Sequence, residues 1–186
     1  EVVSAEGINL HLADGTVLID GMASWWCAIH GYNHPVLNEA AKSQIDKMSH
    51  VMFGGITHAP AVNLCETLVQ ITPNGLDKVF LSDSGSVAVE VAIKMAFQYW
   101  ISQGQPNKNK LLSLRNGYHG DTFAAMSACD PTTGMHHMFE QVVAKQHFAP
   151  APQIGVHEEW NEQDIAEFAQ IISAKRADLA AVILEP

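Results

Sequence analysis

The stretch Ser82-Asp83-Ser84-Gly85-Ser86-Val87-Ala88-Val89 follows the apolar run Lys78-Val79-Phe80-Leu81 and opens a long helical pattern. A small-residue loop between a strand and a helix predicts an anion site, because the first amides of the helix lack intrahelical partners and the positive end of the helix dipole points the same way. Gly85 allows close approach to the backbone, and Ser86 adds a hydroxyl donor. The loop is neither G-x-G-x-x-G nor G-x-x-x-x-G-K-[ST], so the common dinucleotide and nucleoside triphosphate sites lose support. From these residues alone, an ordinary Ser/Asp-capped helix remains the alternative.

Composition limits the classes of protein that fit. The 186 residues are 47% hydrophobic and 16% charged, which favours a folded core over disorder. The formal charge of −10 and the ten scattered Lys and Arg residues argue against a nucleic-acid surface. We find no membrane-spanning run and no signal peptide. The three scattered cysteines, Cys27, Cys65 and Cys129, favour a reducing cytoplasm over a disulfide framework.

The order of the elements predicts an α/β domain with a mainly parallel sheet. We expect a β-hairpin from residues 8–11 and 16–19, helices starting at Pro35 and Pro60, strands at 78–82, 110–114 and 179–184, and helices at about 87–102, 122–129 and 162–174. The 87–102 helix is apolar nearly all round, which predicts burial on most sides. Residues 130–160 read as irregular. Ligands bind at the carboxyl ends of such strands, where the loops 83–86 and 115–121 and the residues after Glu185 would meet.

Two aromatic features have both a binding and a packing interpretation. Trp25 and Trp26 lie in a loop that is rich in small residues, so one ring could line an apolar pocket while the other packs, or both could pack. Tyr118, between Gly117 and His119-Gly120, could lay its ring on a flat ligand, or could simply pack on a surface turn.

Metal and nucleophile chemistry have little support. The ten histidines include the adjacent pair His136-His137, which cannot act as i, i+4 ligands, and no H-E-x-x-H or C-x-x-C occurs. We therefore expect no metal site. No cysteine has the context of a Cys/His nucleophile pair.

Taken together, these motifs resemble the large domain of fold-type I pyridoxal-phosphate enzymes, and in particular the class III aminotransferases. The match rests on Asp20-Gly21, His34-Pro35, the stretch from Asp83 to Glu90, Gly117-Tyr118-His119-Gly120 and Glu185-Pro186. Within the class, Trp25-Trp26, Met52-Phe53-Gly54-Gly55-Ile56-Thr57-His58 and Arg115-Asn116-Gly117-Tyr118-His119-Gly120-Asp121-Thr122 resemble the biotin-biosynthesis branch. Members of that branch pass an amino group from S-adenosylmethionine to 8-amino-7-oxononanoate.

The resemblance implies pyridoxal 5′-phosphate as cofactor and a role for each matched residue. Gly85 and Ser86 would hold the phosphate, Tyr118 would stack near the pyridine ring and touch the substrate, and Glu185 would lie below the cofactor. Trp25 and Trp26 would line the pocket for the apolar arm of the keto acid. Residues 52–58 would lie at the interface of a homodimer.

The resemblance also implies a division of the chain and a missing part. Residues 1–50 would be an N-terminal segment with the β-hairpin, the Trp-Trp loop and the first helix. Residues 51–186 would be the front of the large domain, with helices on both faces of an incomplete sheet. The Schiff-base lysine of the family would lie beyond Pro186, so we expect this stretch alone to be inactive. Two alternatives stay open: another class III ω-aminotransferase that uses diamines or ω-amino acids, and a non-catalytic module that binds a phosphate-bearing ligand.

Overall fold

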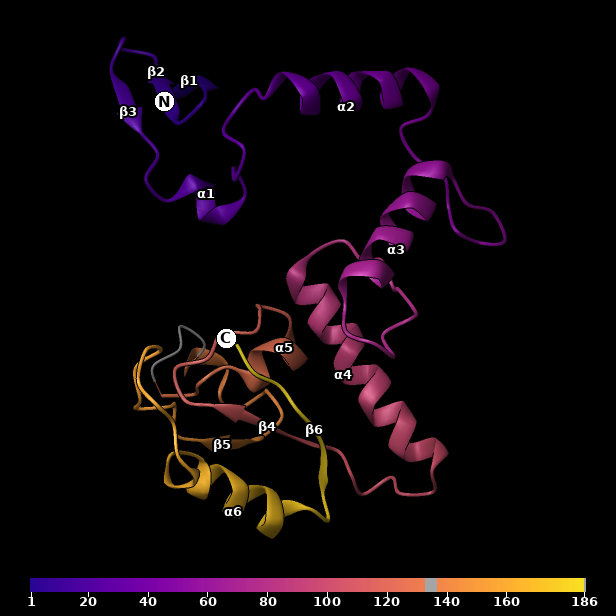
Figure 1. The fold of residues 1–186 in the computed structure, drawn as a ribbon, viewed down its shortest axis with the longest axis vertical. Coiled ribbons are helices and arrows are strands. Elements are labelled where there is room, and N and C mark those ends of the chain that lie inside the picture. The colour runs from indigo at the N-terminus through magenta and orange to yellow at the C-terminus, as the bar shows by residue number, and fades with distance from the viewer. Residues whose placement is uncertain (133–136, 186) are drawn as a thin grey trace. The chain divides into compact units, whose positions relative to one another are not determined.

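The computed structural model describes residues 1–132 and 137–185 of the chain, and it separates into two compact units (Figure 1). These are Glu1–Val79 and Phe80–Pro186. The division expected at residue 50 stays a prediction about family architecture. No helix in the described residues combines the length and apolarity needed to cross a membrane.

The first unit opens with a small antiparallel sheet in the order β1-β2-β3. The predicted hairpin is confirmed, because Asn9 pairs with Ile19 and His11 with Val17. The strand β1 was not predicted. The elements of this unit are β1 (Val2–Glu6), β2 (Asn9–Leu12), β3 (Val17–Ile19), α1 (Ala23–Trp26), α2 (Pro35–Lys47) and α3 (Ala59–Ile71).

Proline sets the starts of the two long helices of the first unit, as predicted. Pro35 is the first residue of α2, and Pro60 lies in the first turn of α3, where a missing amide hydrogen costs nothing. His58 caps α3 by accepting a hydrogen bond of 3.3 Å at Nδ1 from the Ala61 amide.

The second unit is built on a parallel sheet in the order β5-β4-β6. This confirms the α/β class and the predicted parallel sheet. The elements are α4 (Gly85–Ser102), β4 (Lys110–Leu114), α5 (Phe123–Ala128), the 3-10 turn η1 (His137–Phe139), β5 (His147–Ala149), the 3-10 turn η2 (Glu162–Ile165), α6 (Ala166–Lys175) and β6 (Leu179–Val182).

Two neighbouring leucines of the central strand β4 serve two separate cores, because alternate side chains of a strand point to opposite faces. Leu111 packs with Ile93 of α4 and Ala128 of α5. Leu112 packs with Ala149 of β5 and Leu179 of β6, against apolar side chains of α6. The prediction of helices on both faces of the sheet is therefore confirmed.

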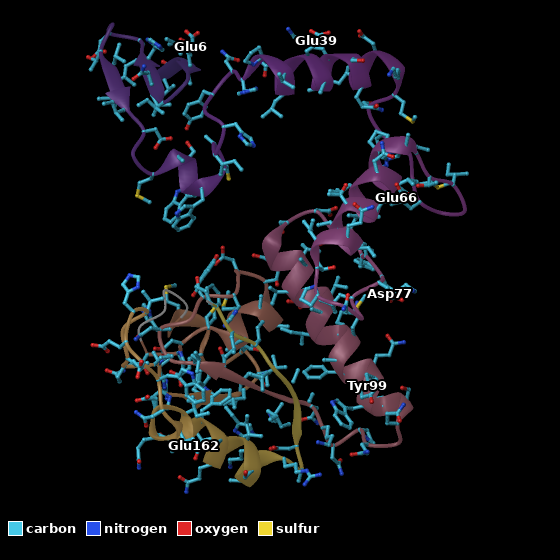
Figure 2. The ribbon with its side chains drawn as sticks, in the orientation of Figure 1. Glu6, Glu39, Glu66, Asp77, Tyr99 and Glu162 are labelled. Carbon is cyan, nitrogen blue, oxygen red and sulfur yellow. The ribbon has the colours of Figure 1, made fainter. Side chains whose placement is uncertain are left out.

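Three local expectations were wrong. Residues 78–82 form no strand, because a strand requires a partner for its backbone groups and none of the described strands pairs with them. Helix α4 is not buried on most sides: Tyr99 is 56% exposed (Figure 2), since the sheet and α5 cover only one side of the helix. The supposedly irregular 130–160 segment contains the strand β5, which pairs with β4 from Leu112 to Leu114.

Candidate functional site

The N-terminus of α4 has the local structure that the Ser-Gly-Ser loop predicts, starting two residues earlier than expected. Ser84 is the N-cap, and its hydroxyl accepts a hydrogen bond of 3.3 Å from the Val87 amide. Within the described part of the chain, no hydrogen-bond acceptor is recorded for the amides of Gly85 and Ser86. A Cβ built on Gly85 would meet nothing within 4 Å, so the space beside its Cα is open. Two free donors at the positive end of an 18-residue helix suit an anion such as a phosphate.

The loop after β4 lies directly against this helix start. The Asp121 amide donates a hydrogen bond of 3.0 Å to Ser86 Oγ. Gly120 has a φ of +124°, and a Cβ there would lie only 2.6 Å from Ser86 Oγ. Glycine is therefore required at residue 120 both for its backbone conformation and for the close approach. Because Ser86 Oγ accepts from Asp121, the hydroxyl keeps its own hydrogen for a ligand.

Tyr118 and Glu185 extend the same region from two strand ends. The Tyr118 amide donates to Glu185 Oε2 at 2.9 Å, and the Tyr118 hydroxyl donates to Asp121 Oδ2 at 2.9 Å. The hydrogen bond to Asp121 raises the pKa of Tyr118 above its ordinary value, so the phenol stays protonated at neutral pH. Its ring is 46% exposed and can contact a bound molecule.

These groups line one open cavity of about 460 Å³ within the second unit. The structure thus brings together Gly85, Ser86, Tyr118 and Glu185, the four residues predicted to bind a cofactor. The free amides and the Ser86 hydroxyl fit a phosphate, and the exposed aromatic ring fits a flat heterocycle. Their role in binding stays a prediction. The residues lining the cavity are Ser84, Gly85, Ser86, Val89, Tyr118, His119, Gly120, Leu184 and Glu185.

A buried cluster of His119, Ser113 and Cys129, which the sequence motifs do not predict, holds the Tyr118 turn. His119 Nε2 lies 2.9 Å from Ser113 Oγ of β4, and the His119 amide donates to Cys129 Sγ at 3.1 Å. Burial lowers the pKa of His119, although the nearby Glu185 carboxylate opposes this. Burial likewise raises the pKa of the Cys129 thiol. The imidazole and the thiol are therefore neutral at neutral pH and hold the turn by hydrogen bonds.

Glu90 of α4 was also missed as part of the site. Its Oε2 accepts from Thr122 Oγ1 and from the amides of Ala124 and Ala125, the latter two at 3.1 Å. It therefore ties α5 to α4 one helical turn beyond Ser86. The available sequence signal was the i, i+4 spacing of Ser86 and Glu90, which places both side chains on one face of the helix.

The tryptophan pair lies in the first unit and is held by a polar cluster. Trp25 and Trp26 are 71% and 72% exposed, and their rings meet edge to face with centroids 5.9 Å apart. Neither ring is buried among the described residues, and the choice between a pocket-lining and a packing role stays a prediction. The turn α1 that carries them has a positive φ at each of its four residues. The Asp20 carboxylate fixes this turn by accepting from the Ser24 hydroxyl at 3.0 Å and from the Tyr32 hydroxyl at 2.5 Å.

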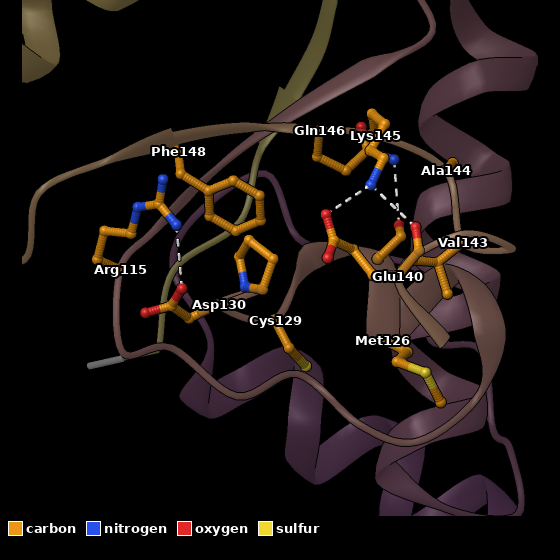
Figure 3. A pocket seen from close by; sticks show the side chains of 12 residues that line it. Arg115, Met126, Cys129, Asp130, Glu140, Val143, Ala144, Lys145, Gln146 and Phe148 are labelled. Atoms are coloured by element: carbon orange, nitrogen blue, oxygen red, sulfur yellow. Dashed lines mark hydrogen bonds and ion pairs between the residues drawn. The ribbon is translucent and has the colours of Figure 1, made fainter. Parts of the chain in front are cut away.

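A second cavity of the second unit, of about 220 Å³, has charged groups that are already paired. In Figure 3, Arg115 reaches Asp130 and Lys145 reaches Glu140, at 3.1 and 3.0 Å. Because these ions neutralise one another, this cavity is a weaker candidate for a charged ligand. The described residues also contain no group of three or more His, Cys, Asp or Glu side chains arranged for a metal. His136, of the adjacent histidine pair, and Pro186, of the Glu-Pro motif, lie outside the described residues.

Comparison of this chain with known proteins identifies its family. The family model "Aminotransferase class-III" matches residues 1–186. The adenosylmethionine-8-amino-7-oxononanoate aminotransferase of Buchnera aphidicola subsp. Acyrthosiphon pisum is 56% identical over 100% of this chain, and the chain spans 43% of that relative's length.

Solved structures agree with this assignment. The crystal structure of adenosylmethionine-8-amino-7-oxononanoate aminotransferase from Methanocaldococcus jannaschii superposes with a TM-score of 0.88 at 34% identity, covering 98% of this chain and 40% of that one. A PMP-bound aminotransferase from Vibrio fluvialis superposes with a TM-score of 0.87 at 27% identity, covering 100% and 42%. With the family model matched along its whole length and the same fold in both structures, the chain belongs to the class III aminotransferases.

Proposed function

We propose that this chain is the front part of an aminotransferase of biotin biosynthesis, which transfers an amino group from S-adenosylmethionine to 8-amino-7-oxononanoate to give 7,8-diaminononanoate. The observation that carries the proposal is the cavity in which the open amides of α4 meet the Tyr118 turn and Glu185. The names of the relatives from Buchnera aphidicola and Methanocaldococcus jannaschii support the substrates.

The cavity suits pyridoxal 5′-phosphate as cofactor. When bound, this group supplies the electron sink that amino transfer requires. The amides of Gly85 and Ser86 and the Ser86 hydroxyl would hold its phosphate, in line with the dipole of α4. Tyr118 would present its ring to the heterocycle. Glu185 would hold the Tyr118 backbone in place by accepting the 2.9 Å hydrogen bond from its amide.

The family supports our proposals for the substrate contacts and the oligomer, and the cysteines support the one for the cellular location. Trp25 and Trp26 would contact the long apolar arm of the keto acid, since both rings are exposed. Tyr118 would contact the substrate on the cofactor. A homodimer would use residues 52–58, of which Met52 and Phe53 expose apolar side chains. Three free cysteines suit a reducing cytoplasm.

Donor specificity in the full-length protein tests the substrate. Amino transfer to 8-amino-7-oxononanoate with S-adenosylmethionine as donor would support the proposal. Transfer from diamines or ω-amino acids, with no use of S-adenosylmethionine, would make the protein a general ω-aminotransferase instead. Reversible cofactor binding without any amino transfer would favour a non-catalytic phosphate-binding module.

A substitution at Ser86 tests the cofactor site separately. Losing a hydrogen bond to a charged phosphate removes about 1.5–3 kcal/mol, so Ser86→Ala should weaken binding of pyridoxal 5′-phosphate about 10- to 150-fold. Ser102→Ala is the matched control, because Ser102 lies at the other end of α4 and its hydroxyl donates to the Tyr99 carbonyl of the same helix. Equal affinities of the two variants would rule out the assigned role of Ser86.

A further inference from the structure

Two segments far apart in the sequence make up the proposed phosphate site, and something must fix their separation. One is the start of α4, with Ser86 and Glu90, and the other is the loop that leads into α5, with Asp121 and Thr122. At Ser86 the segments are joined by the 3.0 Å hydrogen bond from the Asp121 amide to Ser86 Oγ and by a longer one, 3.4 Å, from Thr122 Oγ1 to the Ser86 carbonyl. A hydrogen bond through one rotatable hydroxyl holds a loop weakly unless other contacts fix the loop.

Glu90 provides those contacts. A single carboxylate oxygen, Oε2, accepts from the Thr122 hydroxyl and from the amides of Ala124 and Ala125. Thr122 is the N-cap of α5, yet its side chain makes no capping bond within its own helix. The first amides of a helix need an acceptor, and a negative charge beside them is stabilising. Glu90 therefore caps α5 from the neighbouring helix, and in doing so it holds the 117–122 loop against α4.

The position of this loop determines where the Ser86 hydroxyl hydrogen can point. With the loop fixed, the Asp121 amide occupies one lone pair of Ser86 Oγ, which leaves the hydroxyl to donate elsewhere. The hydroxyl lines the cavity together with the two open amides. Donors that are oriented before binding lose less conformational entropy when the anion arrives.

We propose that Glu90 is a positioning residue for the cofactor phosphate: by capping α5 it fixes the Asp121 amide against Ser86, which orients the Ser86 hydroxyl toward the phosphate. This inference rests on the proposed cofactor. It assigns Glu90 no contact with the cofactor, so its effect must pass through Ser86.

The test compares ligands with and without the phosphate. For the full-length apo-protein, we would measure the dissociation constants of pyridoxal and of pyridoxal 5′-phosphate. The first constant divided by the second gives the contribution of the phosphate to binding. Loss of an oriented charged hydrogen bond is worth about tenfold, so Glu90→Ala should lower this ratio about tenfold. Glu90→Gln keeps a neutral acceptor oxygen and should lower it less. Glu167→Ala is the control, because Glu167 lies in the first turn of α6, on an element that does not line the cavity.

A double variant shows whether the effect passes through Ser86. Coupled residues are non-additive, so adding Glu90→Ala to Ser86→Ala should change the ratio less than about twofold further. An undiminished effect in the Ser86→Ala background would overturn the proposal. So would a Glu90→Ala protein that loses thermal stability but keeps the wild-type ratio, since capping would then be merely structural. If Glu90→Ala does not fold, Glu90→Gln decides: a wild-type ratio overturns the proposal, and a lowered ratio supports it.

Failure of the cofactor proposal would look different. In that case the wild-type protein itself would bind pyridoxal and pyridoxal 5′-phosphate equally, before any substitution is made. A strong wild-type preference for the phosphate with an unchanged ratio in Glu90→Ala would refute only the role of Glu90.

Discussion

Replacing Gly120 by alanine probes the tightest contact of the cavity. A Cβ at this residue would lie 2.6 Å from Ser86 Oγ, 2.9 Å from Ser86 Cα and 3.0 Å from Ser86 Cβ. Rotating the Ser86 side chain would relieve only the first of these contacts, because Cα and Cβ move only with the backbone of α4. The φ of +124° is an additional obstacle for any residue with a Cβ.

The expected cost has two parts. A non-glycine residue in a sparsely populated backbone region costs about 1–3 kcal/mol. Forcing an extra methyl group into a filled contact costs about 1–3 kcal/mol more. Gly120→Ala should therefore lower the free energy of unfolding by about 2–6 kcal/mol. It should also weaken binding of pyridoxal 5′-phosphate, because the displaced element carries the Ser86 hydroxyl.

Urea denaturation followed by circular dichroism would measure the change, with Gly104→Ala as the matched control. Gly104 also has a positive φ, +70°, but a Cβ there would meet nothing within 4 Å. Its substitution therefore reports backbone strain alone, about 1–2 kcal/mol. If Gly120→Ala destabilised the protein no more than Gly104→Ala, the close approach to Ser86 would be refuted.

Three further predictions concern other parts of the structure. Because burial lowers the pKa of His119 below that of the unfolded chain, unfolding takes up a proton as the pH falls below about 6.5. Stability should therefore decrease from about pH 7.5 to about pH 5.5, and His119→Gln should flatten that slope in urea titrations at each pH. The Asp130 side chain is buried and accepts hydrogen bonds from the amides of Asn116 and Thr132, whereas its ion-pair partner Arg115 is 44% exposed. Asp130→Ala should therefore lower the free energy of unfolding by about 1–3 kcal/mol, measured by the same titration, and a loss well under 1 kcal/mol would contradict this. Trp25→Ala should raise the KM for the keto acid far more than it changes the absorbance of the bound cofactor, and equal damage to both would favour simple packing.

Local signals in the sequence account for most of the second unit. The strand β4 was predicted at its observed bounds, because an apolar run lies between a polar connector and the Arg115-Asn116-Gly117 turn. The helix predicted at about 162–174 begins as the 3-10 turn η2, which Asn161 and Asp164 cap with a reciprocal capping box, and continues as α6 from Ala166. The small-residue loop likewise indicated a helix start, which was predicted at about Val87 and lies at Gly85. Each of these signals acts over a few residues, which is why the sequence alone reveals it.

The misses share a different cause, which is dependence on partners far along the chain. The strand β5 is three residues long and is a strand only through its pairing with β4. Residues 78–82 have the composition of a strand but lack that pairing in the described chain. Glu90 contacts residues more than thirty positions away, so its role depends on the folded distance between α4 and α5. The spacing within α4 places Glu90 on the same face as Ser86, but it does not identify Thr122, Ala124 and Ala125 as its partners.

The central position of β4 has a consequence for how the chain is made. Both neighbours of this strand follow it in the sequence, and β6 begins about 65 residues after β4 ends. A ribosome adding about 5–20 residues per second needs roughly 3–13 s for that length. During this interval Leu112 lacks Leu179 of β6, one of the buried residues that it later packs against. Nascent chains of this protein should therefore depend on chaperones that shield apolar segments, more than a protein whose strands pair with their immediate neighbours.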